Sequence, residues 1–217
     1  MIDSREVIQY LNRVGLPKLN EANIWGTRDG RVAIGVVLLV RKNQNIVVVR
    51  KETVKNYEFS DMLSLPGGVV RGLAPQSFAA SFERSLLARA RDEAGLNETD
   101  LSDFRTLPVT VTPVSRYTAK GASRLTVLFP VEAKLERPVK PEATRSSVKE
   151  VFFAALPLDW KAFAPANRLI LAWAFADQIS AQERIMHADQ LQSALTFCNS
   201  AAEDAGLPHF RNPWTDY

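Results

Sequence analysis

The sequence predicts an α/β protein in which strands surround one central helix and helical segments lie at both ends of the chain. Three observations predict this class. The nearly continuous β-branched apolar run VAIGVVLLV, at residues 32–40, is typical of a strand buried on both faces. The segment from Phe78 to Ala94 is amphipathic with helical spacing, and a helical pattern returns from about residue 165 onward.

The remaining elements follow from local signals along the chain. Apolar residues at helical spacing predict a first helix over residues 4–14, with Ser4 as its N-cap and Gly15 as its stop. Asn43-Gln44-Asn45 is a turn, so the run at residues 46–50 returns as the second arm of a hairpin. Further strands are expected at residues 109–114, 124–134 and 148–156, and further helices at residues 166–179 and 187–206. We divide the chain into residues 1–31, 32–160 and 161–217.

Composition limits the classes of function. The chain has 217 residues and a formal net charge of +3, a mildly basic balance that fits an anionic small ligand and is too weak to indicate nucleic acid. Its single cysteine, Cys198, excludes an internal disulfide. The N-terminal residues do not resemble a secretory signal, and no stretch approaches the roughly 18 apolar residues that span a bilayer. We therefore expect a soluble cytoplasmic protein without a membrane partner, and leave a homodimer open.

The most informative stretch is LPGGVVRGLAPQSFAASFERSLLARARDEAGL, residues 65–96. On a helical wheel, Arg89 and Glu93 fall on the broad apolar side that includes Phe82 and Leu86. Charged groups on a half-buried side require partners. Arg89 and Glu93 form either a structural ion pair or part of a ligand site, and the residues alone leave both interpretations open.

Gly67 and Gly68 also have two interpretations. In the first, they form a simple turn, since glycine adopts positive φ at little cost. In the second, they allow the backbone to approach a phosphate closely. Gly95 is the expected C-terminal stop of the helix. Arg50, Lys51, Arg71 and Arg116 are basic residues able to contact phosphate, and of these we assign Arg50 and Arg71 to the site.

The order of a strand hairpin, Leu-Pro-Gly-Gly, and a helix ending Asp-Glu-Ala-Gly-Leu resembles the Nudix hydrolases, whose box is G-x5-E-x7-R-E-U-x-E-E-x-G-U with U an aliphatic residue. With Gly95 and Leu96 as anchors, the final acidic pair falls on Asp92 and Glu93. The preceding box glutamate falls on Arg89, and the first one falls on Ala80. The box is therefore degenerate over residues 68–96, and its loop carries about six extra residues.

The resemblance implies a mixed-sheet α/β/α sandwich with an N-terminal helix and a C-terminal helical extension. It also implies Mg²⁺- or Mn²⁺-dependent hydrolysis of a nucleoside diphosphate derivative or related pyrophosphate. Asp92, Glu93 and Glu150 would then be the metal ligands, with Glu93 and Glu150 as the catalytic residues. Gly67, Gly68, Arg50, Arg71 and Arg89 would bind the substrate.

Two alternatives belong to other functional classes. A catalytically degenerate domain would bind a nucleotide or a protein without chemistry, and Arg89 would then neutralise the ligand phosphate in place of a metal. A purely structural domain would show no affinity for phosphate. Under the metal interpretation Arg89 repels the cation, and Arg89→Glu is expected to bind Mg²⁺ more tightly.

Overall fold

The computed structural model describes residues 4–20, 23–27, 30–52, 60–72, 77–114 and 124–215. The helices are α1 (Ser4–Arg13), α2 (Phe78–Ala94), α3 (Pro165–Ala174), α4 (Ala181–Met186) and α5 (Ala188–Asp204). The strands are β1 (Lys18–Leu19), β2 (Trp25–Gly26), β3 (Val32–Lys42), β4 (Asn45–Lys51), β5 (Leu63–Ser64), β6 (Gly67–Val69), β7 (Leu101–Thr106), β8 (Thr110–Val114), β9 (Arg124–Leu135) and β10 (Val148–Ala155).

The strands form one mixed sheet centred on β3. The apolar β3 lies parallel to β9 along most of its length and antiparallel to β6 at residues 35–37. The hairpin predicted around residues 43–45 joins β3 to β4, and β4 pairs in turn with β10. Strands β7 and β8 add antiparallel to β9. The long β3 is buried on both faces because helices cover the sheet on each side.

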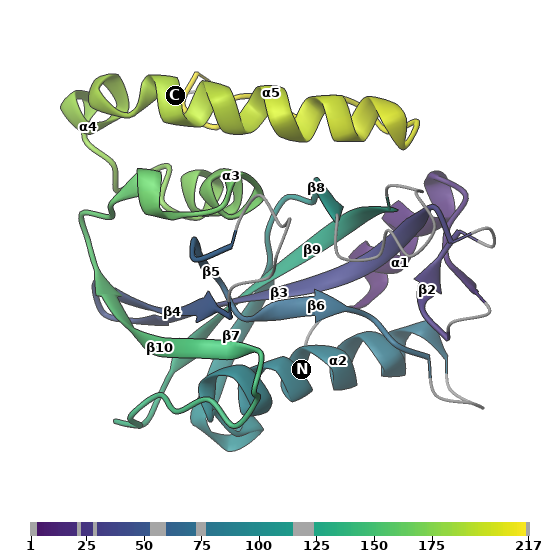
Figure 1. The fold of residues 1–217 in the computed structure, drawn as a ribbon, viewed down its shortest axis with the longest axis horizontal. Helices are drawn as coiled ribbons and strands as arrows, with labels where there is room; N and C mark the ends of the chain where they lie inside the picture. Colours follow the sequence, from purple (N-terminus) through teal and green to yellow (C-terminus); the bar gives the residue numbers. More distant parts are fainter. Residues whose placement is uncertain are drawn as a thin grey trace.

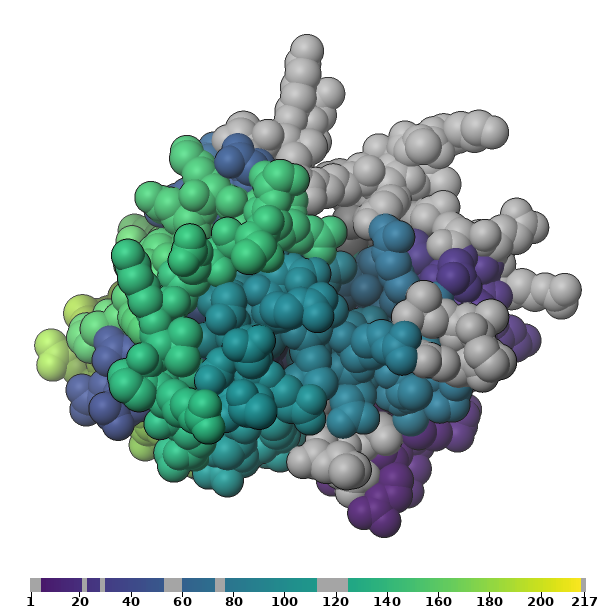
Figure 2. Space-filling model, turned by 90° about the horizontal axis from the view of Figure 1, so that it is seen from below, coloured from purple at the N-terminus to yellow at the C-terminus, as the bar shows by residue number. Residues whose placement is uncertain are grey.

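Figure 1 shows α2 on one face of the sheet, and α3 with α5 on the other. Figure 2, seen from below, shows α2 in blue-green between the green segment that includes β10 and the purple N-terminal segment. One hydrophobic core lies between the sheet and α2, and it includes Phe82 and Leu86. A second core joins β3 and β4 to α3 and α5 through residues such as Ile170 and Leu195. The fold is α/β with helical layers on both faces of a mixed sheet, as predicted.

Arg41, at the end of β3, anchors the C-terminal helical layer to the sheet. Its Nη2 donates to the carbonyl oxygen of Ala174 over 2.8 Å, and its guanidinium lies 4.0 Å from the ring centre of Phe175. Its Nε lies 2.7 Å from the buried carboxylate of Glu132. Burial lowers the pKa of Arg41, and the adjacent Glu132 partly opposes that shift. These contacts hold the end of α3 against the end of β3.

The long elements lie where the sequence predicts them, within about two residues at most ends. The expected first helix, the hairpin and the strands at 109–114, 124–134 and 148–156 correspond to α1, β3 with β4, β8, β9 and β10. Gly95 ends α2 with a φ of 67°. Strand β7, the helix α4 and the short strands β1, β2, β5 and β6 were not predicted, and the helix expected at residues 166–179 ends at Ala174. Gly67 and Gly68, for which a simple turn was one of two interpretations, are paired residues of β6.

Cys198 is buried in the second core. Its pKa is raised to about 11, mainly because burial disfavours the thiolate, and a hydrogen bond with Thr110 opposes the shift. Within the described residues, none of the helices has the length and apolar character needed to span a bilayer.

Candidate functional site

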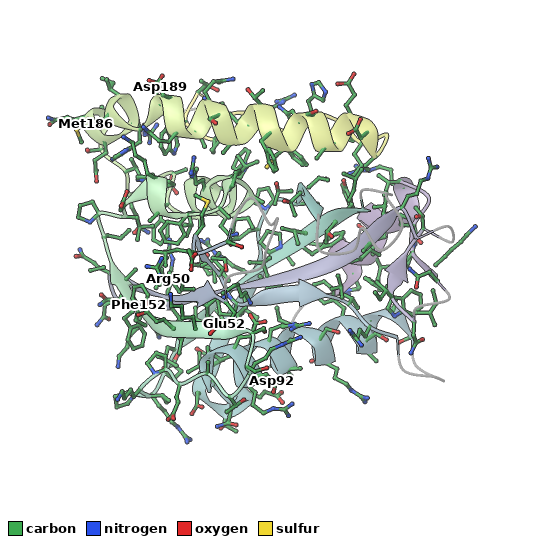
Figure 3. The ribbon with its side chains drawn as sticks, viewed as in Figure 1. Arg50, Glu52, Asp92, Phe152, Met186 and Asp189 are labelled. Carbon is green, nitrogen blue, oxygen red and sulfur yellow. The ribbon has the colours of Figure 1, made fainter. Side chains whose placement is uncertain are left out.

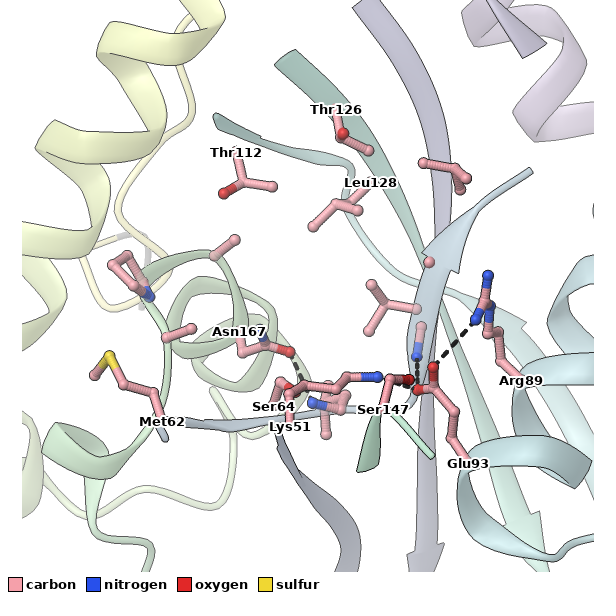
Figure 4. A pocket seen from close by; sticks show the side chains of 18 of the residues that line it. Lys51, Met62, Ser64, Arg89, Glu93, Thr112, Thr126, Leu128, Ser147 and Asn167 are labelled. Carbon is pink, nitrogen blue, oxygen red and sulfur yellow. Dashed lines mark hydrogen bonds and ion pairs between the residues drawn. The ribbon is translucent and has the colours of Figure 1, made fainter. Parts of the chain in front are cut away.

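A cavity of about 220 Å³ opens where β6, the C-terminal half of α2 and the start of α3 meet. Figure 4 shows Glu93 between Lys51 and Arg89, with Asn167 and Ser64 on the side of α3. Among the described residues that line it, four are basic, namely Lys51, Arg71, Arg89 and Arg145, and Glu93 is the one acid. Four positive charges and one negative charge give the lining a net charge of +3.

Glu93 is the centre of this cluster, and its side chain is only 2% exposed. Its Oε2 accepts a hydrogen bond from Lys51 Nζ and one from the backbone N–H of Gly67 at 3.0 Å. Its Oε1 accepts from Arg89 Nη1 at 3.2 Å and lies 3.7 Å from Arg145 Nη1. A carboxylate has about four lone-pair directions, so three hydrogen bonds occupy most of the acceptor capacity of Glu93, and the Arg145 guanidinium lies beside it as a further cation.

Local sequence spacing explains how the cluster forms. Residues 89 and 93 are one helical turn apart on α2, so Arg89 and Glu93 lie on the same face. That face also carries Phe82, Leu86 and Ala90, which are fully buried, and the packing of those residues brings Glu93 against the sheet. The wheel-based prediction that the two charges lie on the buried side is confirmed, since the Arg89 side chain is 12% exposed.

The two glycines of β6 are required by close packing. A Cβ added to Gly67 would lie 2.7 Å from the carbonyl oxygen of Val36 on the neighbouring strand. A Cβ added to Gly68 would lie 2.6 Å from the Arg89 Cζ. The Arg89 guanidinium therefore lies directly against the backbone of Gly68. A direct contact between either glycine and a ligand stays a prediction.

Gly68→Ala is expected to displace the Arg89 guanidinium and to weaken phosphate binding by about tenfold, the loss of roughly one charge-assisted contact. Calorimetric titration with pyrophosphate measures the effect. In a protein that already carries Arg89→Ala, Gly68→Ala should lower the affinity little further, because the guanidinium that it would displace is absent. An undiminished tenfold loss in that background would show that Gly68 acts independently of Arg89.

Arg145 reaches the cluster from the segment before β10. The N–H groups of Thr144 and Arg145 both donate to the carbonyl oxygen of Asp92, at 3.1 and 2.9 Å. The N–H of Glu142 donates to Ala94 O at 3.2 Å. These bonds satisfy carbonyl groups at the end of α2, which lack partners within the helix, and place Arg145 beside Glu93. Arg145 was not predicted as a site residue, since no local pattern in the sequence marks its contact with the end of α2.

Three predicted site residues do not line the pocket. The carboxylate of Asp92 is 38% exposed and pairs with Arg91 at 2.9 Å. Glu150 and Arg50 pair with each other at 3.1 Å across β4 and β10, and both are substantially exposed. Figure 3 shows Arg50 beside these two strands and Asp92 on α2.

Alternation along the strand explains this arrangement. Successive side chains of a strand point to opposite faces, so Lys51 enters the pocket while Arg50 and its partner Glu150 do not. The expectation that Asp92, Glu93 and Glu150 converge is therefore wrong. Arg71 does line the pocket, whereas Arg116 lies outside the described residues.

A divalent cation does not fit the residues that are present. Mg²⁺ and Mn²⁺ prefer oxygen ligands, commonly carboxylates. The one carboxylate in the described lining already accepts from two cationic side chains and a backbone N–H and lies beside a third cation. Within the described part of the chain, no group of three acidic, histidine or cysteine side chains is close enough to hold a metal ion. The donor set is suited to an anion.

Comparisons with known proteins give structural similarity alone. No family model matches the sequence, and no curated protein matches it. The Nudix domain of Shewanella oneidensis NrtR, solved with ADP-ribose, is 17% identical, with 69% of this chain and 88% of that chain covered and a TM-score of 0.47. The MutT Nudix hydrolase from Burkholderia pseudomallei is 18% identical, with 65% and 97% covered and a TM-score of 0.45. The MutT protein from Methanosarcina mazei Go1 is 11% identical, with 70% and 99% covered and a TM-score of 0.46.

Proposed function

We propose that the protein binds a nucleoside diphosphate or a related pyrophosphate, and that basic side chains take the place of the divalent cation. The observation that supports this function most directly is the environment of Glu93. Lys51, Arg89 and Arg145 surround one buried carboxylate, which leaves an excess of positive charge facing the cavity. An excess of cationic donors at the end of a cavity favours phosphate oxygens.

Glu93 organises the cationic side chains in this proposal. Its ion pairs hold Lys51 and Arg89 toward the cavity before a ligand arrives, which lowers the entropy lost on binding. Guanidinium groups match the spacing of phosphate oxygens and bind them bidentately. The apolar side chains of Val37, Leu65 and Leu128 line the same cavity and offer a surface for the uncharged part of the ligand.

The Mg²⁺-dependent hydrolysis implied by the family resemblance has weaker support. It requires several carboxylates around one ion, and the positions of Asp92 and Glu150 do not supply them. We therefore favour the alternative of a nucleotide-binding domain without metal-dependent chemistry.

The test is a panel of pyrophosphate, ADP, GDP and ADP-ribose, scored for binding in EDTA and for hydrolysis in Mg²⁺ or Mn²⁺. Binding in EDTA without metal-dependent turnover is expected. Lys51→Met should weaken binding about tenfold or more, because a charge-assisted contact is lost. Lys149→Met is the matched control, since Lys149 is exposed and pairs with Asp61 outside the pocket. Binding that requires Mg²⁺ and is followed by phosphate release would overturn the proposal.

A further inference from the structure

The N-terminus of α3 also lines this cavity. Ala164, Pro165, Ala166 and Asn167 all belong to the lining. The first backbone N–H groups of a helix have no partner within the helix. Pro165 has no N–H, and the N–H of Arg168 already bonds to Ala164 O at 3.0 Å. The amides of Ala166 and Asn167 are therefore the donors at this helix end.

This helix end carries no side-chain cap in the described part of the chain. Its N-cap residue is Ala164, which has no side-chain oxygen. The helices α2 and α4 differ, because Ser77 and Ser180 cap them through their hydroxyl groups. The uncapped end lines the cavity, so a ligand atom can approach the two free amides.

Two polar side chains at this end provide an independent observation. Asn167 is 91% buried, and its Oδ1 accepts from the N–H of Leu65 at 2.9 Å. That bond uses Oδ1 and leaves the Nδ2 donor of Asn167 without an acceptor among the described residues. The Ser64 hydroxyl is buried and has no partner among the described residues. A buried polar group without a partner is uncommon in folded proteins, and a bound group that satisfies the Ser64 hydroxyl is one explanation.

The donors at this end suit an oxyanion. The two amides, Asn167 Nδ2 and the Ser64 hydroxyl can all donate, and the described lining near them has no carboxylate. The helix dipole adds a partial positive charge at the same point. The same lining also includes the apolar side chains of Val37, Leu65 and Leu128.

We propose that the N-terminus of α3, with Asn167 and Ser64, is a second oxyanion subsite. The preferred ligand then carries two anionic groups joined by a less polar part. One group binds the cluster of Lys51, Arg89 and Arg145, and the other binds the α3 amides. This inference rests on the proposed function for the first group and adds a role for the C-terminal segment.

The test compares linear alkanediol bisphosphates of increasing length with alkyl monophosphates of the same length, by calorimetry in EDTA. The best bisphosphate should bind native protein about tenfold more tightly than its monophosphate, since a helix N-terminus and charge-assisted bonds favour a second anion. Asn167→Asp keeps an acceptor for Leu65 but replaces the donor with a charged oxygen. It should remove the bisphosphate advantage, measured as the ratio of bisphosphate to monophosphate affinity, because the added charge inside the cavity opposes both ligands but abolishes the second subsite.

Gln178→Glu is the matched control, because it adds one negative charge at an exposed residue outside the lining and should preserve the advantage. Ser64→Ala, which removes only a hydroxyl, gives a second test if Asn167→Asp fails to fold, and should reduce the advantage. Equal affinities for bisphosphates and monophosphates at every length would overturn the subsite while leaving the basic site intact. Absence of binding by both series would overturn the proposed function and this inference with it.

Discussion

Charge reversal at Arg89 is expected to weaken pyrophosphate binding by about a hundredfold or more. Arg89 is nearly buried, lies against the backbone of Gly68 and contacts Glu93. Arg89→Glu changes the local charge by two units. At about 5 Å and an effective dielectric constant near 20, each unit contributes roughly 3 kcal/mol before screening, so a hundredfold change is a conservative expectation. Calorimetric titration in EDTA measures it.

Arg91→Glu is the matched control on the same helix. Its side chain is 65% exposed and pairs with Asp92, outside the pocket. Exposed charges are screened by water and salt, so affinity should change by about threefold or less. The metal interpretation predicts the opposite for Arg89→Glu, namely tighter Mg²⁺ binding and a gain of hydrolysis. Either of those results, with phosphate binding retained, would contradict the anion-site account.

Removal of the charge at Glu93 is expected to destabilise the fold by about 3 kcal/mol in buffer without multivalent anions, because breaking a buried ion pair leaves uncompensated charge. Glu93→Gln leaves Lys51, Arg89 and Arg145 beside one another without their shared carboxylate. Denaturant unfolding monitored by circular dichroism measures the loss. Saturating pyrophosphate should restore a large part of it, because an anion that binds only the folded state replaces the missing charge.

Glu150→Gln is the control for this substitution. Glu150 is 54% exposed and pairs with Arg50 on the surface. Exposed ion pairs contribute about 0–1 kcal/mol, so this variant should unfold almost like the native protein. If Glu93→Gln lowers the free energy of unfolding no more than Glu150→Gln does, the cationic cluster is stable without its carboxylate and the prediction is wrong.

The long elements of the fold could be predicted because each carries its own periodic signal. The apolar run of β3 and the helical spacing of α2 need no knowledge of their neighbours. The strands that were missed take their structure from a partner. Gly67–Val69 has no strand-forming composition, and its pairing with residues 35–37 of β3 makes it β6. In β7, exposed polar residues interrupt the apolar pattern, and pairing with β9 defines the strand.

The predicted residues that line the pocket are Arg89 and Glu93 on one helix, together with Gly67, Gly68 and Arg71. The spacing of Arg89 and Glu93 places both on the buried face of α2. Lys51 was among the candidate phosphate contacts, yet Arg50 was assigned instead, although strand alternation separates the two residues. Arg145 and Asn167 join the pocket through contacts distant in sequence, with Asp92 and Leu65 respectively. No local pattern reveals such contacts.

The central claim is that this pocket binds phosphate through cations and that Glu93 is their counter-ion. The most direct test is titration of pyrophosphate into native protein and Glu93→Gln in EDTA, with Mg²⁺ added in a parallel series. The account predicts that Glu93→Gln binds about tenfold or more tightly, because removing a negative charge close to the ligand outweighs the lost pre-organisation of Lys51 and Arg89. It also predicts that Mg²⁺ strengthens binding in neither protein. Native binding that depends on Mg²⁺ and is lost in Glu93→Gln would contradict it.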